Sequence, residues 1–97
     1  MAIIFSKACE YGIQATLYIA TIPERRVGIK EIAAELHIPV HFLAKILQSL
    51  GERGILSSFK VVHGGYTLQR SPDNIHIIDI VEAIDGLEFL ERCVLGF

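Results

Sequence analysis

The residues best suited to recognise another molecule share one face of a single predicted helix. They are a histidine, a lysine, an amide and small side chains, four of them spaced at i, i+3, i+4 and i+7: His41, Ala44, Lys45, Gln48 and, alongside, Val40. Such a face fits the major groove of DNA, which is about 12 Å wide. There, Gln48 can pair with an adenine edge, Lys45 can donate to guanine or phosphate, and small apolar groups can contact thymine methyls. An ordinary exposed helix surface has the same composition, so this pattern alone leaves both interpretations open.

A second group of polar residues follows, in a segment patterned like a β-hairpin. It contains hydroxyls, cations and a pair of glycines: Ser57, Ser58, Lys60, His63, Gly64 and Gly65. Hydroxyl and cationic groups bind backbone phosphates, which set affinity and register, whereas base contacts set sequence choice. The glycines allow a positive φ or a close backbone approach, so their N–H groups are also candidate phosphate donors. A glycine pair is equally expected in any hairpin turn.

Three helices must position these residues. The first is predicted from Lys7 to about Thr21, with Ser6 as its N-cap and Pro23 beyond its end. Its inward stripe is expected to be Ile13, Leu17 and Ala20, widened by Ala8, Ala15 and Ile19. Gly12 within this helix costs about 1 kcal/mol relative to alanine, which indicates close packing against another helix.

The second and third helices show the clearest periodicity in the chain. The second is expected to end near His37, because a proline pushes the residue before it out of the helical region; its inward residues are Ile29, Ile32, Ala33 and Leu36. Pro39 suits the first turn of the third helix, whose inward residues are Leu43, Ile46, Leu47 and Leu50, with Gly51 and Gly54 at its end. Two short helices joined by a tight turn after another helix form a helix-turn-helix unit.

A β-hairpin and a last helix follow. Residues 55–60 and 66–68 are predicted strands around a turn at residues 63–65, and a hairpin in this place is a wing. After a turn at residues 72–74, residues 75–77 are expected to add a short strand. The final helix should bury Ile77, Ile80, Val81 and Ile84, with Gly86 beyond its end. The predicted fold class is therefore mainly α with a small β-hairpin wing, a winged helix-turn-helix.

Charge is distributed unevenly along the chain. The net charge is −2, yet residues 25–70 carry seven Lys or Arg against three Glu, a net charge of +4. Residues 71–97 carry one Arg against six Asp or Glu, a net charge of −5. A basic segment coinciding with the predicted helix-turn-helix and wing indicates double-stranded DNA as the partner.

Other classes of protein are disfavoured. No apolar run reaches the roughly 18 residues of a membrane span, and the first residues lack a basic leader, so we expect no membrane partner and a cytoplasmic location. The histidines do not converge with a nucleophile and an orienting group, so we expect no enzyme. Cys9 and Cys93 lie far apart, outside any metal-binding motif. Taken singly, each cysteine is expected to be a small buried hydrophobe.

The chain resembles the Rrf2 family of bacterial winged helix-turn-helix regulators, the group of IscR, NsrR, RirA and CymR. The resemblance runs through almost the whole sequence, in the segments 5–15, 29–33, 38–47, 54–68, 80–86 and 93–96. It implies a homodimeric transcription regulator, which we expect to be a repressor, on a near-palindromic operator. It also implies that the helix carrying Lys45 and Gln48 is the recognition helix and that the wing enters a neighbouring minor groove.

Two departures from the family pattern affect these expectations. The wing has Lys60-Val61-Val62-His63 where relatives carry Arg-Gly, which leaves Lys60 as the substitute cation. In cluster-binding members three cysteines hold an iron–sulfur cluster, and Cys93 falls where the first would be. The later cysteines and the long C-terminal helix that forms the dimer in relatives are absent from the chain as given. We therefore expect residues 1–86 to form the DNA-binding domain and residues 87–97 to begin a truncated sensor and dimerisation region.

The signal and the function of the protein leave three alternatives open. The chain as given is expected to hold no cofactor, because one thiolate cannot hold a cluster, whereas a longer form is a candidate iron–sulfur or redox sensor with Cys93 as a ligand. A cluster-free regulator that senses a small molecule is a second alternative. A protein-interaction module built on the same scaffold is the third, since a fold does not determine function.

Overall fold

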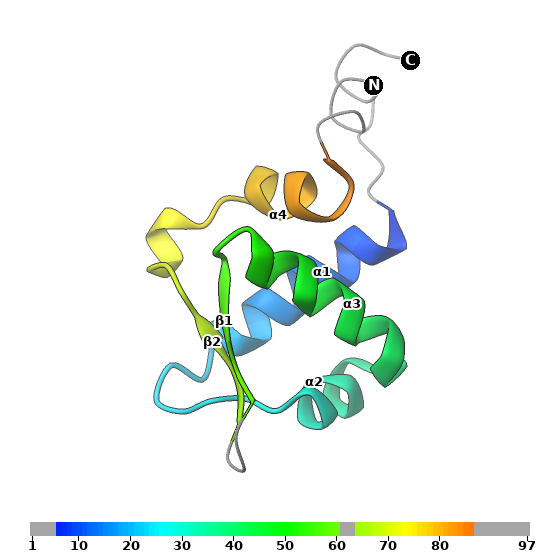
Figure 1. Ribbon diagram of the computed structural model, residues 1–97, viewed down its shortest axis with the longest axis vertical. Coiled ribbons are helices and arrows are strands. Elements are labelled where there is room, and N and C mark those ends of the chain that lie inside the picture. The colour runs from blue at the N-terminus through cyan, green and yellow to red at the C-terminus, as the bar shows by residue number, and fades with distance from the viewer. Residues whose placement is uncertain (1–5, 61–63, 87–97) are drawn as a thin grey trace.

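The computed structural model describes residues 6–60 and 64–86. Its elements in chain order are α1 (Lys7–Ala20), α2 (Ile29–Leu36), α3 (Val40–Glu52), β1 (Leu56–Phe59), β2 (Gly65–Leu68), the short 3-10 helix η1 (Pro72–Asn74) and α4 (Ile77–Ile84). The two strands form an antiparallel hairpin that projects away from α4, and the end of the hairpin where β1 stops and β2 starts lies at the same end of the molecule as α2 (Figure 1). This arrangement confirms the predicted winged helix-turn-helix.

The ends of the helices follow from local chemistry. The Ser6 side chain caps α1 by accepting a hydrogen bond from the backbone N–H of Cys9 at 3.1 Å, as expected. His37 ends α2 in the left-handed conformation, with φ of 56°, and so makes the tight turn into α3. Pro39 is the N-cap of α3 and not part of its first turn, and Gly51 lies inside α3. The predicted start was therefore wrong by one residue, whereas Gly51 and Gly54 lie on either side of the end of α3, as expected.

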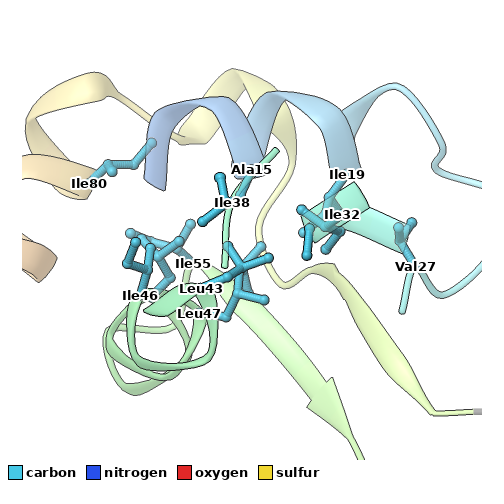
Figure 2. Packing of buried hydrophobic residues seen from close by; sticks show 13 residues of the cluster. Ala15, Ile19, Val27, Ile32, Ile38, Leu43, Ile46, Leu47, Ile55 and Ile80 are labelled. Atoms are coloured by element: carbon cyan, nitrogen blue, oxygen red, sulfur yellow. The ribbon is translucent and has the colours of Figure 1, made fainter. Parts of the chain in front are cut away.

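The core forms where α3 crosses the other helices. All four residues of its predicted inward stripe are buried: Leu43, Ile46, Leu47 and Leu50. Figure 2 shows Leu43 and Leu47 in one cluster with Ala15 and Ile19 of α1 and Ile32 of α2. Ile55 and the first residue of β1 are also buried, so the hairpin is anchored in the same core.

Three predictions about burial and strands were wrong. Leu17 is 61% exposed, because α1 packs through a different face, made of Cys9, Gly12, Ala15, Thr16 and Ile19. Residues 75–77 form no strand, because Asp79 accepts a hydrogen bond from the backbone N–H of His76 at 3.0 Å and starts α4 there. Ile77, the first residue of that helix, is consequently 56% exposed.

Close packing around Gly12 is confirmed. A Cβ atom at this position would collide with the side chain of Ile84 and lie 3.3 Å from Cγ2 of Ile80. The absence of a side chain therefore lets α1 and α4 approach each other. The Ser6 hydroxyl also donates to the Asp85 carboxylate at 2.8 Å and joins the start of α1 to the end of α4. Cys9 of α1 is buried, as expected, and burial together with the carboxylates of Asp85 and Glu10 raises its pKa to about 11.

A third backbone segment joins the wing. Val27, in the connection between α1 and α2, exchanges two hydrogen bonds with Tyr66 of β2, at 3.0 and 2.9 Å. Gly65 makes this approach geometrically feasible: its φ is +150°, and a Cβ atom there would lie 2.8 Å from the Val27 carbonyl oxygen. The wing is thus tied directly to the helix-turn-helix unit.

Candidate nucleic-acid interface

The outer face of α3 presents the predicted recognition residues to solvent. His41, Ala44, Lys45 and Gln48 are exposed, and Val40 is 43% exposed. The orientation of this face follows from the opposite stripe, whose four large residues are locked in the core. The rotation of α3 about its axis is therefore determined by burial, and the recognition residues face outward as a consequence.

A groove joins α3 to the wing. It has a volume of about 720 Å³ and contains predicted contact residues from both elements: Ala44, Gln48, Ser57, Ser58 and Lys60. Val40, His41 and Lys45 do not line it but continue the exposed face along α3. Gln69 and Tyr66 also line the groove, and sequence reasoning missed both because it treated the return strand only as a structural partner. The carboxylate of Glu52 lies at the same groove and disfavours a phosphate close to that point.

A second, smaller hollow lies between the wing and the start of α2. Its volume is about 380 Å³, and it is lined by Lys30 together with Phe59, Lys60 and Gly64. Lys60 therefore borders both hollows, at the point where β1 ends. Gly65 is buried against Val27, whereas Gly64 is half-buried. His63 and Cys93 lie outside the described residues.

Arg25 is held by an acidic partner within the domain. Its guanidinium donates to both carboxylate oxygens of Glu31, at 2.9 and 2.8 Å. The Tyr18 hydroxyl donates to the same carboxylate at 2.8 Å. These hydrogen bonds, that of Arg25 first, hold the pKa of Glu31 below its ordinary value. Arg25 consequently contributes little positive charge to the surface.

Two further arginines of the basic segment are also engaged. Arg53 pairs with Glu82 of α4 at 3.7 Å, and Arg70 pairs with Asp79 at 3.4 Å. Arg70 also donates to the backbone carbonyls of Gly54 and Arg53, at 3.3 and 2.9 Å. These contacts tie α4 to the end of α3, so both arginines have a structural role.

The remaining cations of the basic segment gather on the side of α2, α3 and the wing. Among residues 6–60 and 64–86, four of them make no ion pair with a carboxylate: Arg26, Lys30, Lys45 and Lys60. Fewer cations are therefore available to an external anion than the sequence indicated. Lys30 and Lys60 line the hollows, Lys45 lies on α3, and Arg26 lies against Phe59 of the wing. Positive charge without an internal partner attracts an anion, and the DNA backbone supplies one along its whole length.

Metal binding has no site in the described part of the chain. No group of three or more His, Cys, Asp or Glu side chains is arranged there to hold a metal ion. Iron–sulfur clusters are held by about four protein ligands. Residues 6–60 and 64–86 contain a single cysteine, Cys9. The described residues therefore do not fit a cluster. None of the described helices has the length and apolar character needed to cross a membrane.

A three-helix unit with an exposed recognition face and a hairpin directly after it defines a winged helix-turn-helix protein. The chain belongs to the Rrf2 family: the family model, described as iron-dependent transcriptional regulator, matches residues 5–95. The sequence resemblance is thereby confirmed over nearly the whole chain.

Individual relatives agree with this membership. A protein of Aquifex aeolicus assigned to the HTH-type transcriptional regulators is 39% identical over 95% of this chain. NsrR of Shouchella clausii, also an HTH-type transcriptional regulator, is 30% identical over 84% of the chain. The chain spans 64% of the first relative and 56% of the second.

Solved structures show the same fold. CymR, the global cysteine regulator of B. subtilis, is 27% identical and superimposes with a TM-score of 0.83 over 88% of this chain and 67% of its own. IscR of T. potens is 30% identical, with a TM-score of 0.77 over 86% of this chain and 61% of its own.

Proposed function

We propose that this chain is the DNA-binding part of a sequence-specific transcriptional regulator. The observation that carries the proposal is the groove between α3 and the wing, where five of the predicted contact residues meet, among them Lys60, which pairs with no carboxylate in the described ranges. An exposed helix flanked by such a groove matches the way in which a recognition helix enters the major groove while a hairpin follows the backbone. No catalytic activity is part of the proposal.

Each element has a separate role in this interface. Gln48 and Lys45 read base edges from α3, while Val40, His41 and Ala44 contact bases or the groove wall. The wing contacts the DNA backbone beside the major groove through the remaining site residues: Ser57, Ser58, Lys60, His63, Gly64 and Gly65. Base contacts determine sequence choice and wing contacts determine affinity.

The same proposal extends to the assembly. Residues 1–86 form the DNA-binding domain, and residues 87–97 begin a region for sensing and dimerisation. The regulator acts as a homodimeric repressor on a near-palindromic operator, because a two-fold protein matches a two-fold site. A function on the bacterial chromosome implies a cytoplasmic protein.

Replacing the two residues proposed to contact base edges, Gln48 and Lys45, tests the proposal. An operator is first selected from a pool of random duplexes with the full-length protein. Gln48→Ala and Lys45→Ala are each expected to relax the preference at particular operator positions, by about 1–3 kcal/mol for a good bidentate contact. Competition binding of single-base operator variants measures the effect.

Gln14→Ala, which removes an exposed amide from α1, is the matched control and should leave the preference unchanged. Equal weakening on every duplex would make Gln48 and Lys45 positioning residues. Failure of the protein to bind any duplex, at any salt concentration, would favour the protein-interaction module.

Cys93 is a separate proposal about a full-length form. We propose that its thiolate is one ligand of an iron–sulfur cluster whose other ligands lie outside these 97 residues; a regulator responding to another signal is the alternative. Anaerobic reconstitution with iron and sulfide should leave the 97-residue chain without visible absorption and produce it in the full-length protein. Cys93→Ser in the full-length protein should abolish that absorption, and Cys9→Ser should not, because Cys9 is buried and protonated. Absence of absorption in the full-length protein would contradict the proposal.

A further inference from the structure

Arg26 lies against the wing in an unusual way for an exposed arginine. Its guanidinium carbon lies 3.8 Å from the centroid of the Phe59 ring, at the end of β1. Arg26 immediately precedes Val27, whose backbone is paired with Tyr66, so both ends of this contact are anchored to the hairpin. The position of the guanidinium is therefore restricted although the side chain is exposed.

Phe59 also shares a hollow with two other cations of the basic segment. It lines the smaller hollow together with Lys30 and Lys60. Phe59 thus contacts the guanidinium of Arg26 and shares a hollow with Lys30 and Lys60, and none of these three cations pairs with a carboxylate in the described ranges. Like charges so placed repel each other unless an anion lies between or beside them.

The chemistry of the arginine identifies the anion. A guanidinium carries five N–H donors in its own plane, and an aromatic ring covers a face of that plane without using the donors. No hydrogen bond from the Arg26 side chain to another described residue is present. The donors therefore remain available, in a fork that matches two oxygens of a phosphate.

We propose that Arg26 binds a backbone phosphate of DNA beside the wing, with Phe59 as the platform that orients its guanidinium. This assignment rests on the proposed function and adds to it a contact from the connection between α1 and α2. Lys30 and Lys60 flank the same phosphate path, so the root of the wing, defined by Arg26, Lys30, Phe59 and Lys60, is a phosphate-binding surface.

A salt titration of DNA binding tests the assignment. The full-length protein and its variants are titrated with a mixed-sequence duplex, and the logarithm of the binding constant is followed against the logarithm of the salt concentration. Because each neutralised phosphate releases condensed counterions, Arg26→Ala should lower the slope by about 1 and weaken all sequences alike. Arg26→Lys should keep the slope, since the charge remains. Phe59→Leu should also keep the slope but weaken binding at every salt concentration, because the charge remains and its platform is lost.

Arg53→Ala is the matched control, because Arg53 is an exposed arginine paired with Glu82 on α4, the helix from which the hairpin projects away (Figure 1). It should leave the slope unchanged. A slope for Arg26→Ala equal to that of wild type overturns the assignment while leaving the proposed function intact. A change in sequence preference with Arg26→Ala also overturns it, since that would mark a base contact. Absence of duplex binding by the wild-type protein would contradict both the assignment of Arg26 and the proposed function.

Discussion

Replacing Leu47 by alanine is expected to lower the free energy of unfolding by about 2–5 kcal/mol. Leu47 is 1% exposed and lies in the cluster where α3 meets α1 and α2 (Figure 2). Truncation removes buried apolar contacts and leaves a cavity that the closely packed helices can fill only in part. Because a domain of this size has about 5–15 kcal/mol of stability in total, the variant should be close to unfolding at physiological temperature. Urea denaturation followed by circular dichroism measures the change.

Leu17→Ala is the matched control for this prediction. It makes the same chemical change on α1, at a side chain that is 61% exposed. A surface substitution of this kind should alter the free energy of unfolding by no more than about 0.5 kcal/mol. Similar losses for the two variants would mean that the burial pattern of α1 or α3 is different from the one described.

Gly65→Ala is expected to destabilise the protein by about 1–3 kcal/mol from backbone strain alone. At a φ of +150° a side chain is disfavoured, and the added Cβ would lie 2.8 Å from the oxygen and 2.9 Å from the carbon of the Val27 carbonyl. Both neighbours are backbone atoms, so they cannot move without disturbing the pairing of Val27 with Tyr66. Each lost hydrogen bond of that pair adds about 1 kcal/mol. Thermal unfolding measures the loss, and amide exchange at Val27 shows whether the pairing has opened.

Gly51→Ala separates this effect from a general response to losing a glycine. Gly51 lies inside α3, and the nearest atom to an added Cβ is the Leu56 carbonyl oxygen at 3.8 Å, an ordinary contact. At a helical position that accepts a side chain, alanine should stabilise the protein by about 0.4–1 kcal/mol. Destabilisation by both substitutions to the same extent would contradict the specific role of Gly65.

The sequence predicted the buried face of α3 well and that of α1 only in part, for one physical reason. The inward stripe of α3 consists of four large aliphatic residues, so a 3.6-residue period has a single favourable phase. In α1 the buried face contains Gly12, Ala15 and Thr16, and packing close to α4 is possible because these residues are small. A hydrophobic pattern favours the larger Leu17 instead, because it weighs apolar area and not the closeness of the neighbouring helix.

The sequence predicted which residues belong to the candidate site, but not which of the cations are engaged by other residues of the domain. Exposure of Lys45 and Gln48 followed from the buried stripe opposite them. The ion pairs that engage Arg53 and Arg70 join residues of different structural elements, so no pattern within a single helix or strand could indicate them. The contact between Arg26 and Phe59 is equally nonlocal, and the charge count alone assigned the same weight to all seven cations of the segment.

The backbone pairing of Val27 with Tyr66 has a consequence for the proposed binding of DNA. The two hydrogen bonds restrict the distance between the wing and the helix-turn-helix unit. In the proposed function, this restricted spacing determines which duplex shapes fit the protein. A duplex whose minor-groove width or local bend does not match this spacing must deform to be bound. The energy of that deformation depends on base steps that no side chain touches. Operator preference should therefore extend to uncontacted base pairs between the contact points, where flexible pyrimidine–purine steps or narrow A-tracts decide the fit.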